Sequence, residues 1–346
     1  LHTHPFAAMV NKQDLDTVIR RLFTLRAPKV LITIVLLLSW TDFYQGKDHI
    51  QVIDAFAGAA RIARSARRCG RVAVALDVDY STNSRVFDVN TSPGFVLSLL
   101  AVLEGRFEEL WAALGVCCSS WIVTSRGSTG RSWMLPMGNW AYAKVASANC
   151  MVTRTVCMIL LMFAVGAVWF LEQPHSSLMP RHTRFQWLVR VLEDLGLKVY
   201  YQSFWMKWFR HPTPKRTTVY SSSPLIKELD MGPLTRNHLT PEVQTTDRYQ
   251  NGSGKARFKG NKNLKGTQLY TWKYAAKIVD LGFKSVHQER DPIPNVDFTT
   301  PLTELYEKYE WGDLWSEGHL IDVVRYLRGS KRLTIPEEWR PLLPTE

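Results

Sequence analysis

Five side chains that could bind a ligand or react each follow a predicted strand: Asp54, Asp77, Asp88, Cys118 and Glu172. Carboxylates accept hydrogen bonds from ligand hydroxyls and amines, and a thiolate can act as a nucleophile. In open sheets of parallel strands, ligands bind outside the carboxyl ends of the strands. The pattern therefore predicts one site at which these side chains meet. The alternative is that each is an ordinary turn, cap or buried residue.

The first of these strand ends has the composition of a cofactor-binding turn. Asp54-Ala55-Phe56-Ala57-Gly58 places small residues between a strand and a helix N-terminus, where a ligand can approach the backbone closely. Asp77, at the end of the next strand, is suited to accept hydrogen bonds from ribose hydroxyls. Asp88, at the end of a third short strand, is suited to an adenine amine. Together these residues predict a cofactor that contains adenosine.

This order of motifs resembles the DNA (cytosine-5) methyltransferases and their phage-like relatives. Cys118 lies where that family has its Pro-Cys loop, and Glu172 lies where it has its Glu-Asn motif. Residues 214–220 are similar to the Lys-Pro-Thr segment of the phage-like members. The resemblance covers residues 50–222. The chain also resembles a class of dinoflagellate proteins that carry Cys-Ser-Ser and Glu-Gln-Pro signatures.

The resemblance implies a fold and a cofactor. The fold is an α/β, Rossmann-like sheet of the class I methyltransferase type, mostly parallel, with helical additions at both ends of the chain. The cofactor is S-adenosylmethionine, held by Asp54, Phe56, Gly58, Asp77 and Asp88.

The resemblance also implies a catalytic pair. The Cys118 thiolate would add to carbon 6 of a cytosine that has left the duplex stack, and Glu172 would stabilise the charge at ring N3. Lys215 or Arg216 would hold the base carbonyl or a phosphate. Cys117 is the rival nucleophile, because adjacent residues of an extended segment point in opposite directions.

Several residues depart from the family pattern. Cys117 stands where the family has proline, Gln173 where it has asparagine, and Ala60-Arg61 where it has a glycine pair. No Gln-x-Arg-x-Arg motif stands before the expected recognition region. Most of these changes lie beside the predicted catalytic residues, whereas the predicted cofactor-binding acids are retained. The alternative function is therefore a catalytically degenerate protein of the same fold that binds nucleic acid, derived from a mobile element. Methylation of another substrate is a further alternative, which needs only the cofactor acids.

The charge of the chain favours a polyanionic partner. Lysine and arginine number 43 and acidic residues 31, so the formal net charge is +12. Nucleic acid is the first candidate for such a partner, and the family favours DNA over RNA. The alternative is a basic surface that contacts only solvent. The candidate contacts are Arg126, Arg131, Lys215, Arg216, Lys259, Lys262 and Lys265.

Cysteine usage and hydropathy bear on location. The five cysteines show no zinc-ligand spacing and no disulfide pattern, so the sequence predicts no metal site and an intracellular, reducing compartment, with the nucleus as one candidate. Residues 156–171 form an unbroken apolar run of 16 residues, just short of a membrane span. We expect the end of a core helix followed by a buried strand there. A membrane helix is the alternative, and no membrane partner is expected.

Periodicity predicts elements that alternate between strand and helix from residue 51 onward. Helices are predicted at residues 12–26, 58–68, 93–103, 141–164, 183–195 and 270–281, and strands at 52–54, 72–76, 86–87, 110–116, 168–171, 197–205 and 217–220. Residues 30–38 form either a buried strand or a short helix, which periodicity does not distinguish.

Composition divides the chain into four predicted parts. Residues 1–45 form an N-terminal helical extension and residues 46–225 the methyltransferase-like domain. Residues 226–300 contain a polar, basic loop and a helix that could contact nucleic acid, and residues 301–346 form a C-terminal helical appendage.

Overall fold

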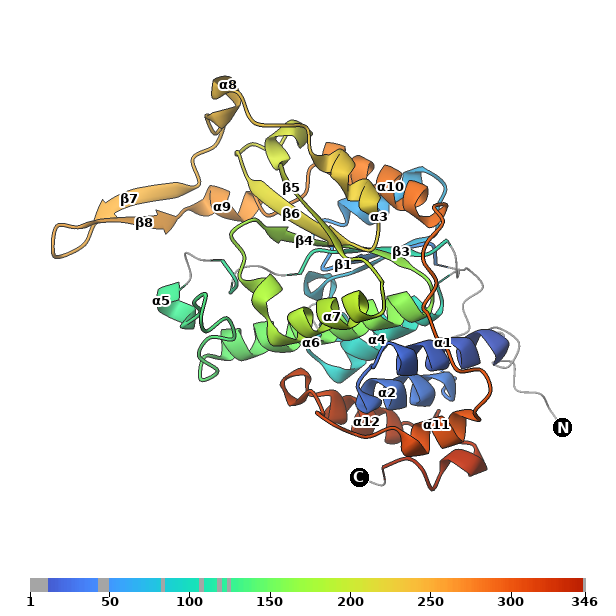
Figure 1. The fold of residues 1–346 in the computed structure, drawn as a ribbon. Coiled ribbons are helices and arrows are strands. Elements are labelled where there is room, and N and C mark those ends of the chain that lie inside the picture. The colour runs from blue at the N-terminus through green and yellow to red at the C-terminus, as the bar shows by residue number, and fades with distance from the viewer. Residues whose placement is uncertain are drawn as a thin grey trace.

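The computed structural model describes residues 12–42, 50–81, 85–105, 109–116, 120–122 and 126–344. The chain is an α/β protein with a mixed, mostly parallel sheet that helices cover on both faces (Figure 1). The predicted α/β class is therefore confirmed at this level. Within these ranges, the structure describes the backbone but not the side chains of residues 12–14, 126 and 257–259.

Six strands form the sheet in the order β2-β1-β3-β4-β6-β5. Their bounds are β1 Val52–Ala55, β2 Ala73–Leu76, β3 Trp111–Leu114, β4 Val168–Pro174, β5 Tyr200–Trp205 and β6 Arg216–Ser221. Strands β1 to β4 are parallel to one another, and β6 is antiparallel to both β4 and β5. From β1 the chain crosses to β2 on one side and later to β3 on the other. The strand order therefore reverses at β1, which is where ligands bind in sheets of this kind.

The central strands are apolar along their whole length because helices cover both of their faces. Every residue of β1 and of β3 is buried. One face is covered by α3 Arg61–Arg68 and α10 Trp272–Val286, whose apolar residues share a core with Val52, Trp111 and Phe170. The opposite face is covered by α4 Ser92–Leu103, α6 Ala143–Ala164 and α7 Thr183–Asp194.

The two ends of the chain form a second helical layer beneath α4 and α6 (Figure 1). It contains α1 Lys12–Thr24, α2 Lys29–Ser39, α11 Leu302–Lys308 and α12 Leu320–Arg328. All residues from Lys29 to Leu38 are buried, and α2 packs against α12. The segment whose type the periodicity left open is thus a helix. It is apolar on every side because other helices surround it.

The strand predicted at residues 86–87 is wrong. Residues 85–91 form turns whose backbone hydrogen bonds stay within the segment, from Asp88 N to Arg85 O and from Thr91 N to Asp88 O. Thr91 then caps α4 by accepting a hydrogen bond from Gly94 N. The local turn chemistry outweighs the short apolar pair, so Asp88 follows a turn and not a strand.

The polar, basic loop predicted within residues 226–300 contains regular elements: α8 Arg236–Leu239, the hairpin strands β7 Thr246–Gln250 and β8 Ala256–Gly260, and α9 Lys262–Gly266. All residues of β7 are exposed. The hairpin projects away from the body of the molecule, on the left in Figure 1.

The apolar run 156–171 is divided between two elements. Its first part ends α6, the chain turns at Gly166 with φ +75°, and its last residues begin β4. The run is therefore the end of a helix followed by a strand, as the sequence predicted, and not one continuous helix. The whole of α6 has the length and composition of a membrane span, but 83% of its apolar window is buried against other elements.

Candidate functional site

A cavity of about 720 Å³ opens at the carboxyl ends of β1, β2 and β3, beside β4. Segments after three strands meet there, together with α9 and the chain that precedes α10. The cavity brings together eight of the residues that the sequence singled out: Phe56, Gly58, Asp77, Asp88, Glu172, Lys215, Lys262 and Lys265. Asp88 reaches it although no strand precedes that residue.

The turn between β1 and α3 has an unusual backbone. Phe56, Gly58 and Ala60 have φ values of +58°, +51° and +52°. For a residue with a side chain, a left-handed conformation costs about 1–2 kcal/mol. Such strain persists where the surroundings hold it, and it is concentrated at functional sites. Here Tyr80 holds the turn, because its hydroxyl donates to Gly58 O at 2.9 Å.

Asp77 organises this side of the cavity. Its carboxylate accepts hydrogen bonds from Gly58 N at 2.8 Å and from Asp79 N at 3.0 Å. One side chain thereby ties the end of β2 to the turn after β1. A carboxylate has about four acceptor positions, so capacity remains for ligand hydroxyls in the cavity that Asp77 lines.

Asp54 occupies a different position from the one the motif suggested. It is buried beneath the turn, does not line the cavity, and accepts a hydrogen bond from Ala63 N at 2.9 Å. The pKa of Asp54 is raised to about 7, chiefly by burial and also by the nearby charge of Asp77, against the hydrogen bond from Ala63 N, which lowers it. Asp54 accepts a hydrogen bond from a free backbone N–H group at the N-terminus of α3, and it thereby stabilises the turn that precedes this helix.

Glu172 lies inside β4 and forms a polar cluster with two residues from distant segments. Its carboxylate accepts from Lys215 Nζ at 3.2 Å and from Tyr270 Oη at 3.3 Å. Burial, together with the Glu172 charge, raises the pKa of Tyr270 well above its usual value. The approach needs Gly115, where a Cβ would lie 2.7 Å from the Tyr270 hydroxyl. The cluster can present a carboxyl group and a hydroxyl to a ring placed in the cavity.

Gln173, the residue that replaces the family's asparagine, is buried and points along the sheet edge. Its side-chain amide donates to Val116 O at 2.9 Å and accepts from Ser177 Oγ at 2.8 Å. It thereby joins the segment after β3 to the segment after β4. Cys117 and the predicted nucleophile Cys118 lie outside the described residues.

Of the other predicted nucleic-acid contacts, Arg131 and Arg216 have described side chains, and neither lines the cavity. Arg131 is buried and bonds within its own loop, to Pro136 O at 2.6 Å and Ser120 Oγ at 3.1 Å. Arg216 is exposed, with its guanidinium 5.6 Å from the centre of the Trp205 ring. Arg126 begins the short helix α5 Arg126–Thr129, and Lys259 lies in β8, but neither side chain is among those described.

Sequence reasoning missed Tyr270 and Tyr80. Neither residue carries a motif, and Tyr270 reaches the cavity only because α10 packs against α3. Arg61 reinforces that packing by donating to Tyr270 O. Among the residues that the structure describes, no three His, Cys, Asp or Glu side chains group as metal ligands would.

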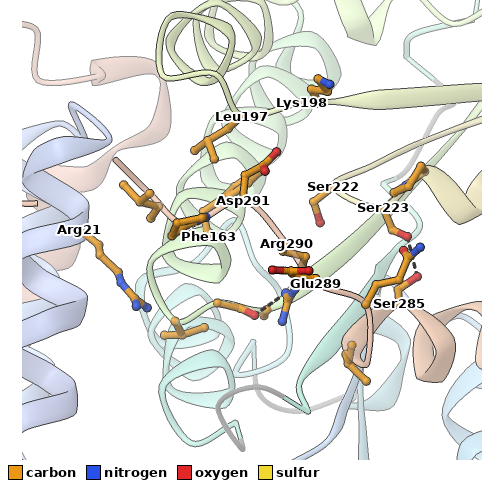
Figure 2. Close-up of a pocket in the computed structure, with 18 of the residues that line it drawn as sticks. Arg21, Phe163, Leu197, Lys198, Ser222, Ser223, Ser285, Glu289, Arg290 and Asp291 are labelled. Carbon is orange, nitrogen blue, oxygen red and sulfur yellow. Dashed lines mark hydrogen bonds between the residues drawn. The ribbon is translucent and has the colours of Figure 1, made fainter. Parts of the chain in front are cut away.

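A second cavity, of about 850 Å³, lies at the opposite edge of the sheet, between α1, the end of α6 and the chain after α10. Figure 2 shows Arg21, Lys198, Arg290 and two acids, Glu289 and Asp291, around it. Arg21 donates to Ala164 O and Arg290 donates to Gly166 O. These arginines satisfy carbonyls at the C-terminal end of α6, which is a structural task. The carboxyl-edge cavity therefore remains the better candidate site.

The chain matches no protein-family model, no curated protein and no solved structure. The class that can be stated is an α/β protein with a mixed, mostly parallel sheet and a ligand-sized cavity at the carboxyl edge of that sheet.

Proposed function

We propose that this chain is an S-adenosylmethionine-dependent methyltransferase that acts on nucleic acid, at carbon 5 of cytosine in DNA. The observation that carries the proposal is the cavity at the reversal of strand order, with Asp77 at the end of the second strand. The mostly parallel sheet agrees with the class I methyltransferase fold that the sequence resembles.

The lining of the cavity suits an adenosine-containing cofactor. Its volume falls within the range of about 300–1,000 Å³ that is usual for small-molecule sites. Asp77 is placed to accept from ribose hydroxyls, and the turn at Gly58 leaves backbone open to a close approach. Phe56 and Phe87 supply apolar surface for a purine, and Asp88 an acceptor for its amine.

The far side of the cavity suits a base and its phosphates. Lys262 and Lys265 line it and contribute positive charge where a polyanion would enter. Glu172 is held by Lys215 and Tyr270 at a position from which its carboxyl group could bond to ring N3 of a pyrimidine. S-adenosylmethionine supplies the electrophilic methyl group in this chemistry. Cys118 supplies the thiolate that adds to carbon 6 of the base.

Calorimetric titration with S-adenosylmethionine tests the proposal. Wild-type protein is expected to bind the cofactor, and Asp77→Ala to bind it about ten- to a hundredfold more weakly, since an unmatched buried donor costs about 1–3 kcal/mol. Asp291→Ala, in the opposite cavity, is the matched control and should bind as wild type does. No binding by the folded wild type, or equal loss in both variants, would contradict the proposal.

A further inference from the structure

An exposed apolar surface lies on the loop that follows β3. Its members are Trp133, Met134, Leu135, Trp140 and Tyr142, with exposed fractions of 59%, 89%, 55%, 44% and 46%. Single exposed apolar side chains are ordinary, but a group of five within ten residues makes this loop a candidate interaction surface. We call these five residues the loop surface.

The backbone beneath the loop surface is held firmly. Arg131 is 2% exposed, donates to Pro136 O, and places its guanidinium 3.4 Å from the centre of the Trp121 ring. Asn149 donates to Met137 O at 3.0 Å, and Asn139 N donates to Thr129 O at 2.8 Å. The apolar side chains are therefore presented by a braced loop, which reduces the entropy lost when a partner binds them.

The charge around the loop surface indicates what the partner is. No Asp or Glu occurs between Glu109 and Glu172, whereas arginine and lysine do. The guanidinium of Arg181 lies 3.0 Å from the centre of the Trp133 ring. Aromatic rings beside a cation, on a segment that itself contains no acids, suit a ligand that combines flat apolar groups with negative charge. Bases on a phosphate backbone have this combination.

The position of the loop surface relates it to the candidate site. The loop leaves the carboxyl end of β3, and Ile122 pairs with Ser177, in the segment that follows β4. The short helix α5 at the start of this loop and the β7–β8 hairpin extend on the same side of the molecule, on the left in Figure 1.

We propose that the loop surface binds the unpaired bases of a single-stranded polynucleotide, which stack on Trp133 and Trp140. In base-paired duplex the flat faces of the bases are stacked on one another, so they are not available to stack on these tryptophans. The inference rests on the proposed function and specifies its substrate as nucleic acid with unpaired bases near the site. A second copy of the chain or a lipid surface would also fit the apolar side chains, but the arginine stacked on the Trp133 ring favours a ligand whose own flat rings can stack there.

Fluorescence anisotropy with labelled oligonucleotides tests the inference on the full chain. The probes are a 15-nucleotide oligo-dT, the matching oligo-U and a 15-base-pair duplex. Wild type is expected to bind the single strands more tightly than the duplex, and comparison of oligo-dT with oligo-U distinguishes DNA from RNA. The double variant Trp133→Ala/Trp140→Ala should bind single strands at least about tenfold more weakly, since a stacked base contributes about 1–3 kcal/mol.

Two further variants separate stacking from folding and from charge. Trp133→Phe should retain most of the affinity, because the phenyl ring still stacks, and Phe298→Ala, an exposed aromatic elsewhere, should change nothing. The affinity loss in the double variant should be the same at low and high salt, because no cation is removed. Equal binding by wild type and double variant, preference for duplex, or self-association that the double variant abolishes would overturn the inference.

Cofactor titration keeps this inference distinct from the proposed function. The double variant should bind S-adenosylmethionine as wild type does, because neither tryptophan lines the cavity. Tryptophan-dependent binding of single strands without any cofactor binding would support the inference and contradict the proposed function. Cofactor binding without tryptophan-dependent binding of single strands would support the proposed function and contradict the inference.

Discussion

Asp54 and Asp77 stand at the ends of adjacent strands but occupy opposite environments. Asp54 is buried and bonded to the first turn of α3, whereas Asp77 faces the cavity. The buried residue holds the strained turn, and the cavity residue is available to a ligand. Two aspartates at similar motif positions thus have different roles. Asp54 is buried in the protein and supports the turn, whereas Asp77 lines the cavity where a ligand could bind.

Asp54→Asn should make stability less dependent on pH. Burial raises the pKa of Asp54 to about 7, so between about pH 4 and 7 the folded state holds a proton that the unfolded state releases. The free energy of unfolding of wild type therefore falls through this residue as pH rises. Asparagine keeps the acceptor for Ala63 N and has no charge. Relative to wild type, the variant should gain about 1–3 kcal/mol between about pH 5 and 7.5.

Urea unfolding of both proteins at the two pH values measures this difference. His182, whose pKa burial lowers to about 3, contributes the opposite trend but is present in both proteins, so it cancels. A stability difference that stays constant with pH would show that Asp54 is already ionised in the fold.

Cys118 should be the residue that bonds to the base. With S-adenosylmethionine present, an oligonucleotide containing 5-fluorocytosine should trap the wild type as a covalent adduct, because the fluorine cannot be removed as a proton is. Cys117→Ser should still be trapped and Cys118→Ser should not, as judged by denaturing gel electrophoresis. Absence of trapping in a wild type that binds both cofactor and DNA would favour the non-catalytic alternative.

At the scale of elements, α9 forms the basic side of the cavity, and the β7–β8 hairpin precedes it in the chain. A two-stranded hairpin with every residue of one strand exposed has little stability of its own. It is connected to the body through α9, whose Lys262 and Lys265 line the cavity.

Lys262→Gln combined with Lys265→Gln should weaken DNA binding mainly at low salt. Each phosphate contact contributes about −0.9 to the slope of log affinity against log salt on duplex DNA, so the slope should flatten by up to about two units. Binding curves at several salt concentrations measure it. Lys198→Gln combined with Lys308→Gln, on other parts of the molecule, is the control and should leave the slope unchanged. An unaltered slope in the first variant would mean that its lysines face solvent alone.

At the scale of the whole molecule, the N- and C-terminal segments form one structural unit although they are distant in sequence. The hydroxyls of Thr33 and Tyr306 lie 2.7 Å apart, and Lys29 Nζ donates to Tyr309 O at 2.6 Å. Thr41 also pairs with Leu333. The predicted extension and appendage therefore share a core with each other and with α4 and α6.

Removal of residues 301–346 should abolish cooperative folding. It uncovers α2, whose residues from Lys29 to Leu38 are all buried in the intact chain, and exposed apolar surface of that size favours aggregation. Thermal unfolding and binding of a hydrophobic dye measure the effect. Replacing the hairpin residues 246–260 by a short glycine linker is the control, and it should leave Tm within a few degrees because every residue of β7 is exposed. A sharp unfolding transition in the truncated chain would show that the appendage is an independent addition.

The sequence by itself determined the order of most strands and helices, because alternation of apolar runs with amphipathic segments is a local property. It also identified Asp77, Glu172 and Gly58 as residues at the carboxyl edge. It placed a strand before Asp88 where local hydrogen bonds form turns instead. A pair of apolar residues is too short to distinguish a strand from a turn.

Only the tertiary structure decided the remaining features of the site. Whether α2 is a helix depended on neighbours at the other end of the chain, which surround it. The cluster of Glu172, Lys215 and Tyr270 joins segments that become neighbours when β6 pairs with β4 and α10 packs on α3. No local pattern encodes these contacts, because their free energy is realised only once distant segments exclude water together.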